Sequence, residues 1–417
     1  MMPELDTEAF DLVVAGGGAA GFFAAITCAE THPGARICIL EKGRRVLSKV
    51  KISGGGRCNV THACFDPGEL VQHYPRGSKQ LRGPFHRWAP GDTMDWFESR
   101  GVPLKTEPDN RVFPKSDDSQ SIIDCLTHTA RRAGIEVRTS TELLGATPRT
   151  GSGFNIQTSG GELLHARQLL MTLGGIRNRI GGDLATQFGH RIHAAAPSLF
   201  TFKIKDHRLD GLQGIAVPEA TAAAGGTEAT GPVLITHWGL SGPAILRVSA
   251  WGARELQTLD YRLPVCINWC GNLSTGEVLE HFQRLRQESP KRNLLTDNQF
   301  NLPVRLWSRL AESAGIHSEH RWPHLGRKVA EELARQLCQC QFRVLGKSMN
   351  KDEFVTCGGV DLDEINFKTM ESRITPGLYF AGEILDIDGI TGGFNFQAAW
   401  TTGRIAGEAV GASSAGP

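Results

Sequence analysis

Three glycines near the start of the chain have the spacing of a dinucleotide-binding turn: Gly16, Gly18 and Gly21. Gly16 permits a tight turn, Gly18 lets the backbone approach a pyrophosphate, and Gly21 lets the next helix pack closely on the preceding strand. The helix N-terminus would then face the phosphate charge, with Ala19 and Ala20 beside the ligand. The spacing therefore predicts a bound dinucleotide.

An acidic residue stands where ribose recognition requires one. Glu41 lies twenty positions after Gly21, and Lys42 follows it. A carboxylate at this distance can accept hydrogen bonds from both ribose hydroxyls. A glycine motif alone is weak evidence, but here the strand before it, the helix after it and the distant acid agree.

Three consecutive glycines stand in a basic loop after this acid. Glycine runs lose the most backbone entropy on folding, so they are expected where backbone lies against a ligand. The cations Lys49, Lys51 and Arg57 could contact pyrophosphate or flavin, and the alternative is a flexible surface loop with solvated charge. We favour the ligand because the loop follows the ribose-binding strand. The cofactor contacts expected here are Lys51, Ser53, Gly54, Gly55, Gly56, Arg57, Cys58 and Asn59.

Two further apolar segments are predicted strands, one followed by two glycines and the other by an acid. A buried strand over 169–173 ends in Gly174 and Gly175. The carboxyl end of a returning strand is where a doubly wound sheet meets its cofactor, so both glycines are expected to contact it. Residues 375–383 read as a turn, a short apolar strand and an acid, and Glu383 would hold the ribityl hydroxyls of an FAD.

The glycine-rich loop after this acid opens the final helix. Exposed amides and the positive helix dipole near residues 393–397 would face the pyrimidine edge of the flavin, where reduction places negative charge. That arrangement raises the electron affinity of the ring without a charged side chain, and the sequence therefore predicts FAD as the cofactor. The contacts expected at this end are Gly382, Glu383, Gly392, Gly393, Phe394, Asn395 and Gln397, with Leu144 from an earlier strand.

The elements that must position these residues follow an α/β pattern. Strands are expected over 10–15 and 36–40, with a helix over 22–30 between them. Residues 66–110 are polar and rich in turn signals, with one amphipathic helix near 91–100.

Further elements complete the first part of the chain. Residues 107–116 could line a substrate entrance, although a structural loop is the usual outcome. A helix is expected from an N-cap at 117–121 to Arg132. Alternating residues then predict a parallel strand and a small antiparallel meander over 135–138, 141–147, 154–157 and 162–167.

The pattern changes near residue 194. Separated strands are followed by amphipathic helices over 275–288, 303–314 and 324–338, which predicts an inserted β-plus-helix domain. His237 could act as an acid or base, but a lone histidine beside tryptophan is more often structural. The small residues of the final helix, 398–409, suit close packing on a sheet. The predicted domains are residues 1–193 and 345–417 for the FAD-binding domain and residues 194–344 for the insert.

Composition narrows the class of protein. The 417 residues are 40% hydrophobic and 21% charged, as in an ordinary soluble protein, and the net charge of +1 predicts neither nucleic acid nor membrane as a partner. An acidic N-terminus and the lack of a long apolar run predict a cytoplasmic protein. The pairs Cys266/Cys270 and Cys338/Cys340 lack the repeated two-residue gaps of a structural zinc site, so no metal is expected.

Several motifs together resemble the BaiN-like flavoproteins, also called aminoacetone-oxidase-type FAD-binding proteins, over nearly the full length. The resemblance implies a glutathione-reductase-like FAD domain interrupted by a β-barrel-like insert with a helical subdomain. The stretch 176–182 departs from the family pattern, so no substrate is carried over. The motifs that carry the resemblance are residues 16–21, 51–59, 236–243, 357–360, 369–372 and 377–397.

The leading hypothesis is an FAD-dependent oxidoreductase in which flavin N5 carries a hydride to or from a small molecule bound between the FAD domain and the insert. No second dinucleotide motif is present, so NAD(P)H would visit the flavin transiently or another donor would serve. No catalytic acid or base can be assigned. The alternatives are a thiol–disulfide reductase that uses Cys58 with Cys64, and a flavin-binding sensor or RNA-associated protein in which FAD is structural.

Overall fold

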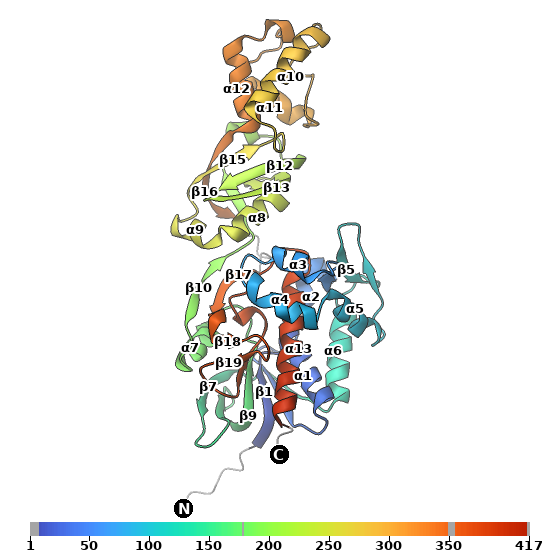
Figure 1. Ribbon diagram of the computed structural model, residues 1–417, viewed down its shortest axis with the longest axis vertical. Coiled ribbons are helices and arrows are strands. Elements are labelled where there is room, and N and C mark those ends of the chain that lie inside the picture. The colour runs from blue at the N-terminus through green and yellow to red at the C-terminus, as the bar shows by residue number, and fades with distance from the viewer. Residues whose placement is uncertain (1–7, 177–178, 349–354, 415–417) are drawn as a thin grey trace, which may run out of the picture. The chain divides into compact units, whose positions relative to one another are not determined.

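The computed structural model describes residues 8–176, 179–348 and 355–414. The chain forms two compact units, Met1–Ala195 with Thr356–Pro417, and Ala196–Val355 (Figure 1). The second unit extends past the predicted boundary at residue 344, because the strand β16 (Cys340–Ser348) completes its barrel. The acidic residues 1–7, and residues 177–178 of the stretch that departs from the family pattern, lie outside the described residues.

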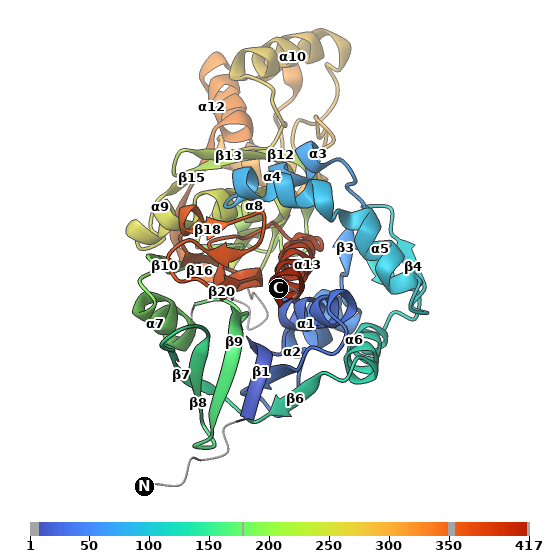
Figure 2. The same cartoon turned by 60° about the horizontal axis from the view of Figure 1, so that its bottom comes forward.

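The first unit is built on a sheet whose central strands are parallel. Strand β1 (Glu8–Ala15) lies between β2 (Ile37–Glu41) and β9 (Leu163–Met171), and Ala15 pairs with both Leu40 and Met171. The carboxyl ends of the three strands therefore stop at the same level. This register places the first glycine turn, Glu41 and the segment after β9 at the same end of the sheet, and Figure 2 shows β1 and β9 side by side.

The other strands of this sheet extend it on both sides. The strand order is β18-β19-β20-β9-β1-β2-β6, and β8 pairs with β9 and β7. The segments 162–167 and 169–173, predicted as two strands, form the single strand β9, because Gln168 is buried between them and continues the pairing with β1. The remaining bounds are β6 Glu136–Thr139, β7 Leu143–Pro148, β8 Phe154–Thr158, β18 Ile365–Asn366, β19 Glu371–Ser372 and β20 Leu378–Phe380.

Two helices pack against each other across this unit: α1 (Ala19–Thr31) and α13 (Phe394–Ser414) (Figure 1). Gly403 and Gly407 stand one turn apart on the contact face of α13. A Cβ at Gly403 would come within 2.6 Å of the Ala20 carbonyl oxygen, and one at Gly407 would overlap the Ala24 carbonyl oxygen. The small residues of the final helix therefore serve mainly close packing on a helix, where packing on the sheet was expected.

Shorter elements surround the glycine loops. A small sheet is formed by β3 (Thr61–His62), β5 (Arg111–Pro114) and β4 (Leu104–Thr106), so residues 107–116 lie largely in a hairpin. Helix α4 was not predicted, because Gly83 and Pro84 interrupt its helical pattern. The helices of this part are α2 Ser48–Ile52, α3 Pro67–Leu70, α4 Ser78–Arg87, α5 Pro90–Glu98, α6 Gln120–Arg132 and α7 Arg179–Gln187.

The second unit contains a closed barrel and a group of helices with their own core. The barrel order is β11-β14-β13-β12-β15-β16. Trp307 and Trp322 are fully buried in the helical part. The bounds are β11 Thr201–Ile204, β12 Ala216–Ala224, β13 Thr227–Ile235, β14 Gly239–Ser241, β15 Pro264–Asn268, α8 Pro243–Trp251, α9 Ala253–Thr258, α10 Thr275–Glu288, α11 Val304–Ser313 and α12 Arg327–Cys338.

Two paired strands form the connections that lead into and out of this insert: β10 (Ile192–Pro197) and β17 (Thr356–Val360). Gly358 has φ +103°, and a Cβ on it would overlap the carbonyl oxygen of Ala194. Glycine is therefore required where the two strands approach each other. In the described part of the chain, none of the helices combines the length and apolarity that crossing a bilayer would need.

Candidate cofactor-binding site

The first glycine turn has the geometry that a pyrophosphate site requires. Gly16 has φ +113°, and a Cβ at Gly21 would overlap the Gly16 carbonyl oxygen, so a side chain at either position would disturb the turn. Thr172 holds the same carbonyl by donating from Oγ1 at 2.9 Å. By contrast, a Cβ at Gly18 would meet no atom within 4 Å. The open space lies at the N-cap of α1, where no side chain caps the helix amides, and it suits a phosphate group.

The carboxylate of Glu41 is fixed beside this turn. It accepts hydrogen bonds from the backbone N–H groups of Gly17 at 3.0 Å and Gly43 at 2.7 Å, one on each oxygen. Each carboxylate oxygen keeps further acceptor capacity for a ribose hydroxyl. Lys42 is exposed next to it. The predicted ribose-binding role therefore fits the position of Glu41.

An ion pair joins two distant segments beside the next glycines. Lys49 in α2 pairs with Glu383, which follows β20. A Cβ at Gly175 would lie 3.3 Å from Glu383 Oε1, and one at Gly174 would lie 3.7 Å from Lys49 Nζ. The structure thus brings the end of β9, the predicted ribityl acid and a cation of the basic loop together. Lys49 was one of the loop cations expected to contact the cofactor. Its pairing with Glu383 could not be predicted, because the two residues are far apart in the sequence and only the fold brings them together.

The basic loop and the C-terminal glycine loop also meet each other. With its amide oriented to suit both neighbours, Asn59 accepts from the Gly393 N–H at 3.0 Å and donates to the Thr61 carbonyl at 2.9 Å. Thr61 Oγ1 in turn donates to Gln397 Oε1 at 2.6 Å. Gly393 has φ +98°, and a Cβ on it would overlap the carbonyl group of Thr61 at 2.5 Å. The two loops predicted to share one cofactor are therefore in direct contact.

The three consecutive glycines serve different purposes. All three have positive φ: +57° at Gly54, +70° at Gly55 and +89° at Gly56. A Cβ at Gly54 would lie 2.9 Å from the Phe113 ring, so this glycine allows close packing. A Cβ at Gly55 or Gly56 would meet nothing within 4 Å. The backbone of these last two residues is open to a ligand.

Several predicted contacts are engaged with protein neighbours. Lys51 pairs with Asp118 at 3.4 Å, and Arg57 pairs with Glu107 at 2.6 Å while lying over the Phe113 ring. The hydrogen bond with Glu107 raises the pKa of Arg57. Arg57 thus ties the loop to the β4–β5 hairpin, and Lys51 ties it to the segment directly before α6. Leu144 lies on β7, which pairs with β8, and its side chain is 49% exposed.

The residues at the start of α13 shape the loop. Gln397 is fully buried and its amide also donates to Thr401 Oγ1 at 3.0 Å, so its side chain is a structural tie. Asn395 both accepts from and donates to the backbone of Gly389, each at 2.8 Å. The side chains of Asn395 and Gln397 are thus bonded within the protein. The part of this loop expected to contact a ligand is the backbone of Gly392 and Gly393.

Sequence reasoning missed the groups that brace this loop from behind. The Tyr74 hydroxyl donates to the Phe394 carbonyl at 2.6 Å, and the His73 ring stacks on Phe394 at 4.3 Å between centroids. Arg76 contacts both carboxylate oxygens of Asp388, which is fully buried. Asp388, directly before Gly389, was the sequence feature that could have indicated this ion pair. Its partner Arg76 lies 312 positions away in the chain, so the spacing does not identify it.

The two cysteines considered for disulfide chemistry lack reactive thiols. Cys58 is fully buried, and burial raises its pKa to about 12. Burial, with smaller effects of Glu69 and Asp66, also raises the pKa of Cys64. The thiolate is the nucleophile in disulfide exchange, and both environments disfavour it. His237, the other candidate, is exposed on the β13–β14 turn.

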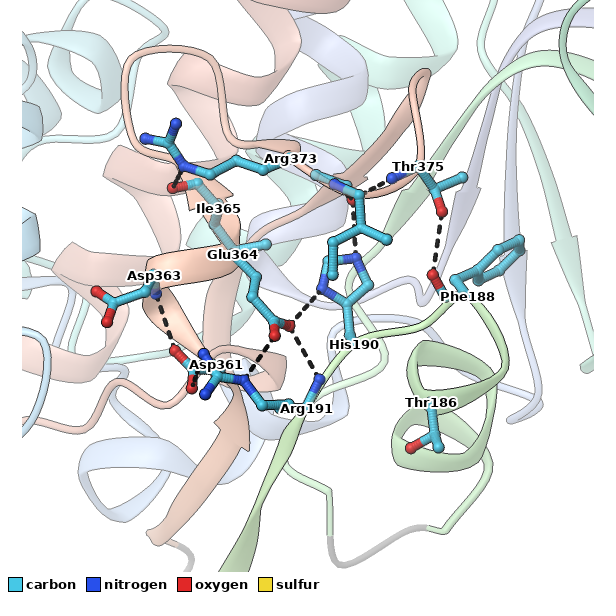
Figure 3. A network of polar contacts seen from close by, with 12 residues as sticks. Thr186, Phe188, His190, Arg191, Asp361, Asp363, Glu364, Ile365, Arg373 and Thr375 are labelled. Carbon is cyan, nitrogen blue, oxygen red and sulfur yellow. Dashed lines mark hydrogen bonds and ion pairs between the residues drawn. The ribbon is translucent and has the colours of Figure 1, made fainter.

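A buried polar network explains two of the family-like motifs (Figure 3). Ser372 Oγ accepts from the N–H groups of Ile374 at 3.0 Å and Thr375 at 2.8 Å, so its own proton points to His190 Nε2 at 2.8 Å. His190 Nδ1 then donates to Glu364 at 3.1 Å. Burial lowers the pKa of His190, although the hydrogen bond with Glu364 opposes this shift.

The same network ties the connections of the insert together. Arg191, directly before β10, pairs with Glu364 at 2.8 Å and with Asp361 at 3.0 Å. Asp361 directly follows β17, and His193 lies 3.3 Å from it. Ser372 of the motif 369–372 thus has a structural role in this network, and the motif 357–360 lies in β17, which ends directly before Asp361. Within the residues that the structure describes, no group of three or more His, Cys, Asp or Glu is arranged to hold a metal ion.

Comparisons with known proteins agree with this architecture. A family model described as "HI0933-like protein Rossmann domain" matches residues 10–409. The ribosomal RNA dihydrouridine synthase of Escherichia coli K12 is 30% identical over 95% of this chain and 96% of its own length. The 3-dehydro-bile acid delta(4,6)-reductase of Clostridium scindens is 28% identical over 95% of this chain and 98% of its own length.

Two solved structures share the fold. The open conformation of a flavocytochrome c3 fumarate reductase has a TM-score of 0.51 and 16% identity, over 98% of this chain and 79% of that chain. The 3-ketosteroid-delta4-(5alpha)-dehydrogenase from Rhodococcus jostii RHA1 has a TM-score of 0.50 and 15% identity, over 99% and 98%. At these identities the likeness concerns the fold, and the predicted FAD-type α/β architecture is confirmed.

Proposed function

The chain belongs to the HI0933-like Rossmann-domain family and is an FAD-dependent oxidoreductase; from that premise we propose that it reduces a carbon–carbon double bond conjugated to a carbonyl group. The predicted resemblance to BaiN-like flavoproteins is confirmed at the level of the family. The contact between Asn59 and Gly393 carries the flavin part of the proposal, because it joins the two glycine loops that would both lie against the flavin.

The residues present fit the cofactor. Gly16–Gly21 and Glu41 would hold the ADP half, and Gly174, Gly175 and Glu383 would hold the middle. The backbone at Gly55–Gly56 and Gly392–Gly393 would lie against the flavin. When bound in its reduced form, FAD supplies a hydride from N5 to the β carbon of the double bond, and a proton completes the reduction at the α carbon. The N-terminus of α13 contributes a positive dipole without a charged side chain.

The names of the relatives support this reaction class. A dihydrouridine synthase adds hydrogen to a ring double bond of uridine, and a delta(4,6)-reductase does so to a double bond of a steroid. Both bonds are conjugated to a carbonyl, so hydride addition to the β carbon serves both. The raised pKa values of Cys58 and Cys64 disfavour the thiol–disulfide alternative. NAD(P)H as donor, and the place of the substrate relative to the insert, stay predictions.

Two substrate classes follow from the relatives. A small-molecule enone or dienone is the class predicted from the sequence, and the near-neutral net charge of +1 supports it, because nucleic-acid affinity depends on phosphate neutralisation. Uridine in ribosomal RNA is the second candidate, because relatives from two organisms, at 30% and 27% identity, are named ribosomal RNA dihydrouridine synthases.

Anaerobic reoxidation of the flavin tests the proposal. The FAD-loaded protein is reduced with NADH or NADPH, or with dithionite if neither reacts, and then mixed with a steroid 4,6-dien-3-one or with ribosomal RNA transcribed in vitro. We expect one of the two to restore the oxidised flavin spectrum and to gain two hydrogens by mass spectrometry. Failure of both to reoxidise the flavin would contradict conjugated double-bond reduction.

A matched variant separates hydride transfer from thiol chemistry. Cys64→Ser removes the partly exposed thiol and leaves the glycine loops unchanged. We expect its rate of flavin reoxidation to equal that of the wild type. A loss of turnover in Cys64→Ser with normal FAD binding would instead support the thiol–disulfide alternative.

A further inference from the structure

Four cysteines gather in the insert, where the barrel joins the helices. Cys266 lies on β15, Cys270 two residues after the end of that strand, Cys338 at the end of α12 and Cys340 at the start of β16. Strands β15 and β16 are antiparallel, with Ile267 opposite Cys340. All four are reduced thiols. Their spacing in the sequence suggests two separate pairs, because it does not contain the pairing of β15 with β16.

The backbone brings Cys270 and Cys338 side by side. The Trp269 N–H donates to the Leu337 carbonyl at 2.8 Å, and the two cysteines are the residues that follow. Their thiols interact with each other, and this interaction shifts the pKa of both groups in opposite directions. A pair of thiols held in this way needs little movement to form a disulfide.

The two thiols are not equivalent. The hydrogen bond from Cys270 stabilises a thiolate at Cys338 and lowers the Cys338 pKa, while the same contact and burial raise the pKa of Cys270. Burial raises the pKa of Cys266, and it raises that of Cys340 to about 11. Cys338 is therefore the most reactive of the four toward an electrophile.

An oxidant can reach this site. Cys338 lines a pocket of about 360 Å³ together with Cys266, Glu228 and the polar residues Asn268 and Asn272. A polar, open pocket admits water and small hydrogen-bonding molecules. Cys338 is 6% exposed where it lines this pocket, and the neighbouring Cys270 is partly exposed.

We propose that Cys270 and Cys338 form a redox-sensitive dithiol in the insert, which a hydroperoxide converts to a disulfide. The Cys338 thiolate attacks one peroxide oxygen, the O–O bond breaks, hydroxide or alkoxide leaves, and the sulfur loses two electrons to become a sulfenic acid. The Cys270 thiol then attacks that sulfur. The S–S bond forms, the S–O bond breaks, and the hydroxyl leaves with the thiol proton as water. An external dithiol reverses the reaction by exchange.

The disulfide would link the connection between β15 and α10 to the end of α12. It would therefore close a covalent loop within the insert between the barrel and its helices. This site is independent of the proposed flavin chemistry, so its test does not depend on the substrate.

Peptide mapping of the FAD-loaded chain tests the proposal. After treatment with one equivalent of hydrogen peroxide and alkylation of the remaining thiols, a non-reducing tryptic digest should contain Leu263–Arg284 linked to Gln336–Arg343. Fragment spectra should assign the link to Cys270 and Cys338, and dithiothreitol should remove it. Absence of the linked peptides at this dose, with Cys338 still alkylated, would overturn the proposal even if the flavin chemistry is as proposed.

Cys266 and Cys340 lie in the same two peptides, so their variants are the matched controls. Cys266→Ser and Cys340→Ser should keep the link, whereas Cys270→Ser and Cys338→Ser should lose it. Cys270→Ser should also slow alkylation of Cys338 at neutral pH, because its thiolate loses a stabilising thiol. A link that persists in Cys270→Ser, or unchanged alkylation of Cys338 in that variant, would contradict the assigned roles.

Discussion

Gly18 and Gly21 belong to one motif but are required for different physical reasons. Gly21 must lack a side chain because a Cβ would overlap the protein's own backbone at Gly16. A Cβ at Gly18 would meet no protein atom within 4 Å, so the fold itself does not require glycine there, and the predicted reason is a bound pyrophosphate. The distinction separates a requirement of folding from a requirement of binding.

Alanine at these two positions should separate the two requirements. We expect Gly18→Ala to leave the free energy of unfolding of the apoprotein unchanged and to raise the Kd for FAD by about tenfold or more, since about 1.4 kcal/mol corresponds to tenfold. Gly21→Ala should destabilise the apoprotein by about 1–3 kcal/mol, because backbone must move. Urea unfolding and fluorescence titration with FAD measure the two effects. A Gly18→Ala protein that binds FAD like the wild type would place the pyrophosphate elsewhere.

Residue types predicted the cofactor, FAD, and the individual contacts expected with it stay predictions. The sequence singles out the glycine runs, Glu41 and Glu383 as candidate contacts. Glycine runs are informative because they lose the most backbone entropy on folding, so they are rare without a specific role. Arg57 and Gln397 were expected at the ligand, yet both bind protein neighbours. A long polar side chain reaches in any direction, so its partner depends on the fold.

At the scale of elements, the packing of α1 on α13 is the feature on which the site depends. Helix α1 presents its N-terminus at the first glycine turn, and α13 begins at the second glycine loop. Glycines on α13 allow the two backbones to approach closely. A change in the distance between α1 and α13 would therefore move the first glycine turn relative to the second glycine loop.

Two glycine substitutions in helices of this unit should have opposite effects. Gly407→Ala places a Cβ 2.7 Å from Thr27 Cβ and into the Ala24 carbonyl, so we expect a loss of about 1–3 kcal/mol in unfolding free energy. At Gly182 in α7 a Cβ would meet Ile176 and Ile192 at 3.9 Å, an ordinary contact. Gly182→Ala should stabilise the helix by about 0.5–1 kcal/mol. Equal effects in thermal unfolding would contradict the packing of α13 on α1.

Element prediction succeeded where hydrophobic periodicity was strong. The first strand–turn–helix unit was predicted because apolar alternation and glycine agree there. Helix α4 contains Gly83 and Pro84, which local propensity assigns to a loop, and tertiary packing of Leu81 and Phe85 overrides it. The end of the insert was placed too early because β16 is recognisable only from its partners β11 and β15.

At the scale of the whole molecule, the His190 network sets how the FAD-binding unit responds to acid. The folded unit holds His190 neutral, because burial lowers its pKa below the ordinary value of 6.5. The unfolded chain therefore binds a proton more readily near pH 6. The stability that this group contributes is fully present above about pH 6.5 and is lost as the pH falls through the folded pKa.

Urea unfolding at pH 7.5 and pH 5.5 tests this dependence. The wild type should lose stability at the lower pH. His190→Gln should be less stable by about 1–3 kcal/mol at pH 7.5, because it disturbs buried hydrogen bonds, yet it should lose less on acidification. His128→Gln, at an exposed position on α6, is the control and should follow the wild type. An identical pH dependence in His190→Gln would show that this histidine is not the titrating group.

The pairing of β10 with β17 has a consequence for how such a protein can change over generations. The chain leaves the FAD-binding unit and returns to it at almost one place, because these two strands lie together. A segment whose two ends are adjacent can be gained, lost or exchanged in a gene without breaking the path of its host. Selection can therefore act on the two units separately, so that a lineage keeps its inherited flavin chemistry while the inserted segment diverges.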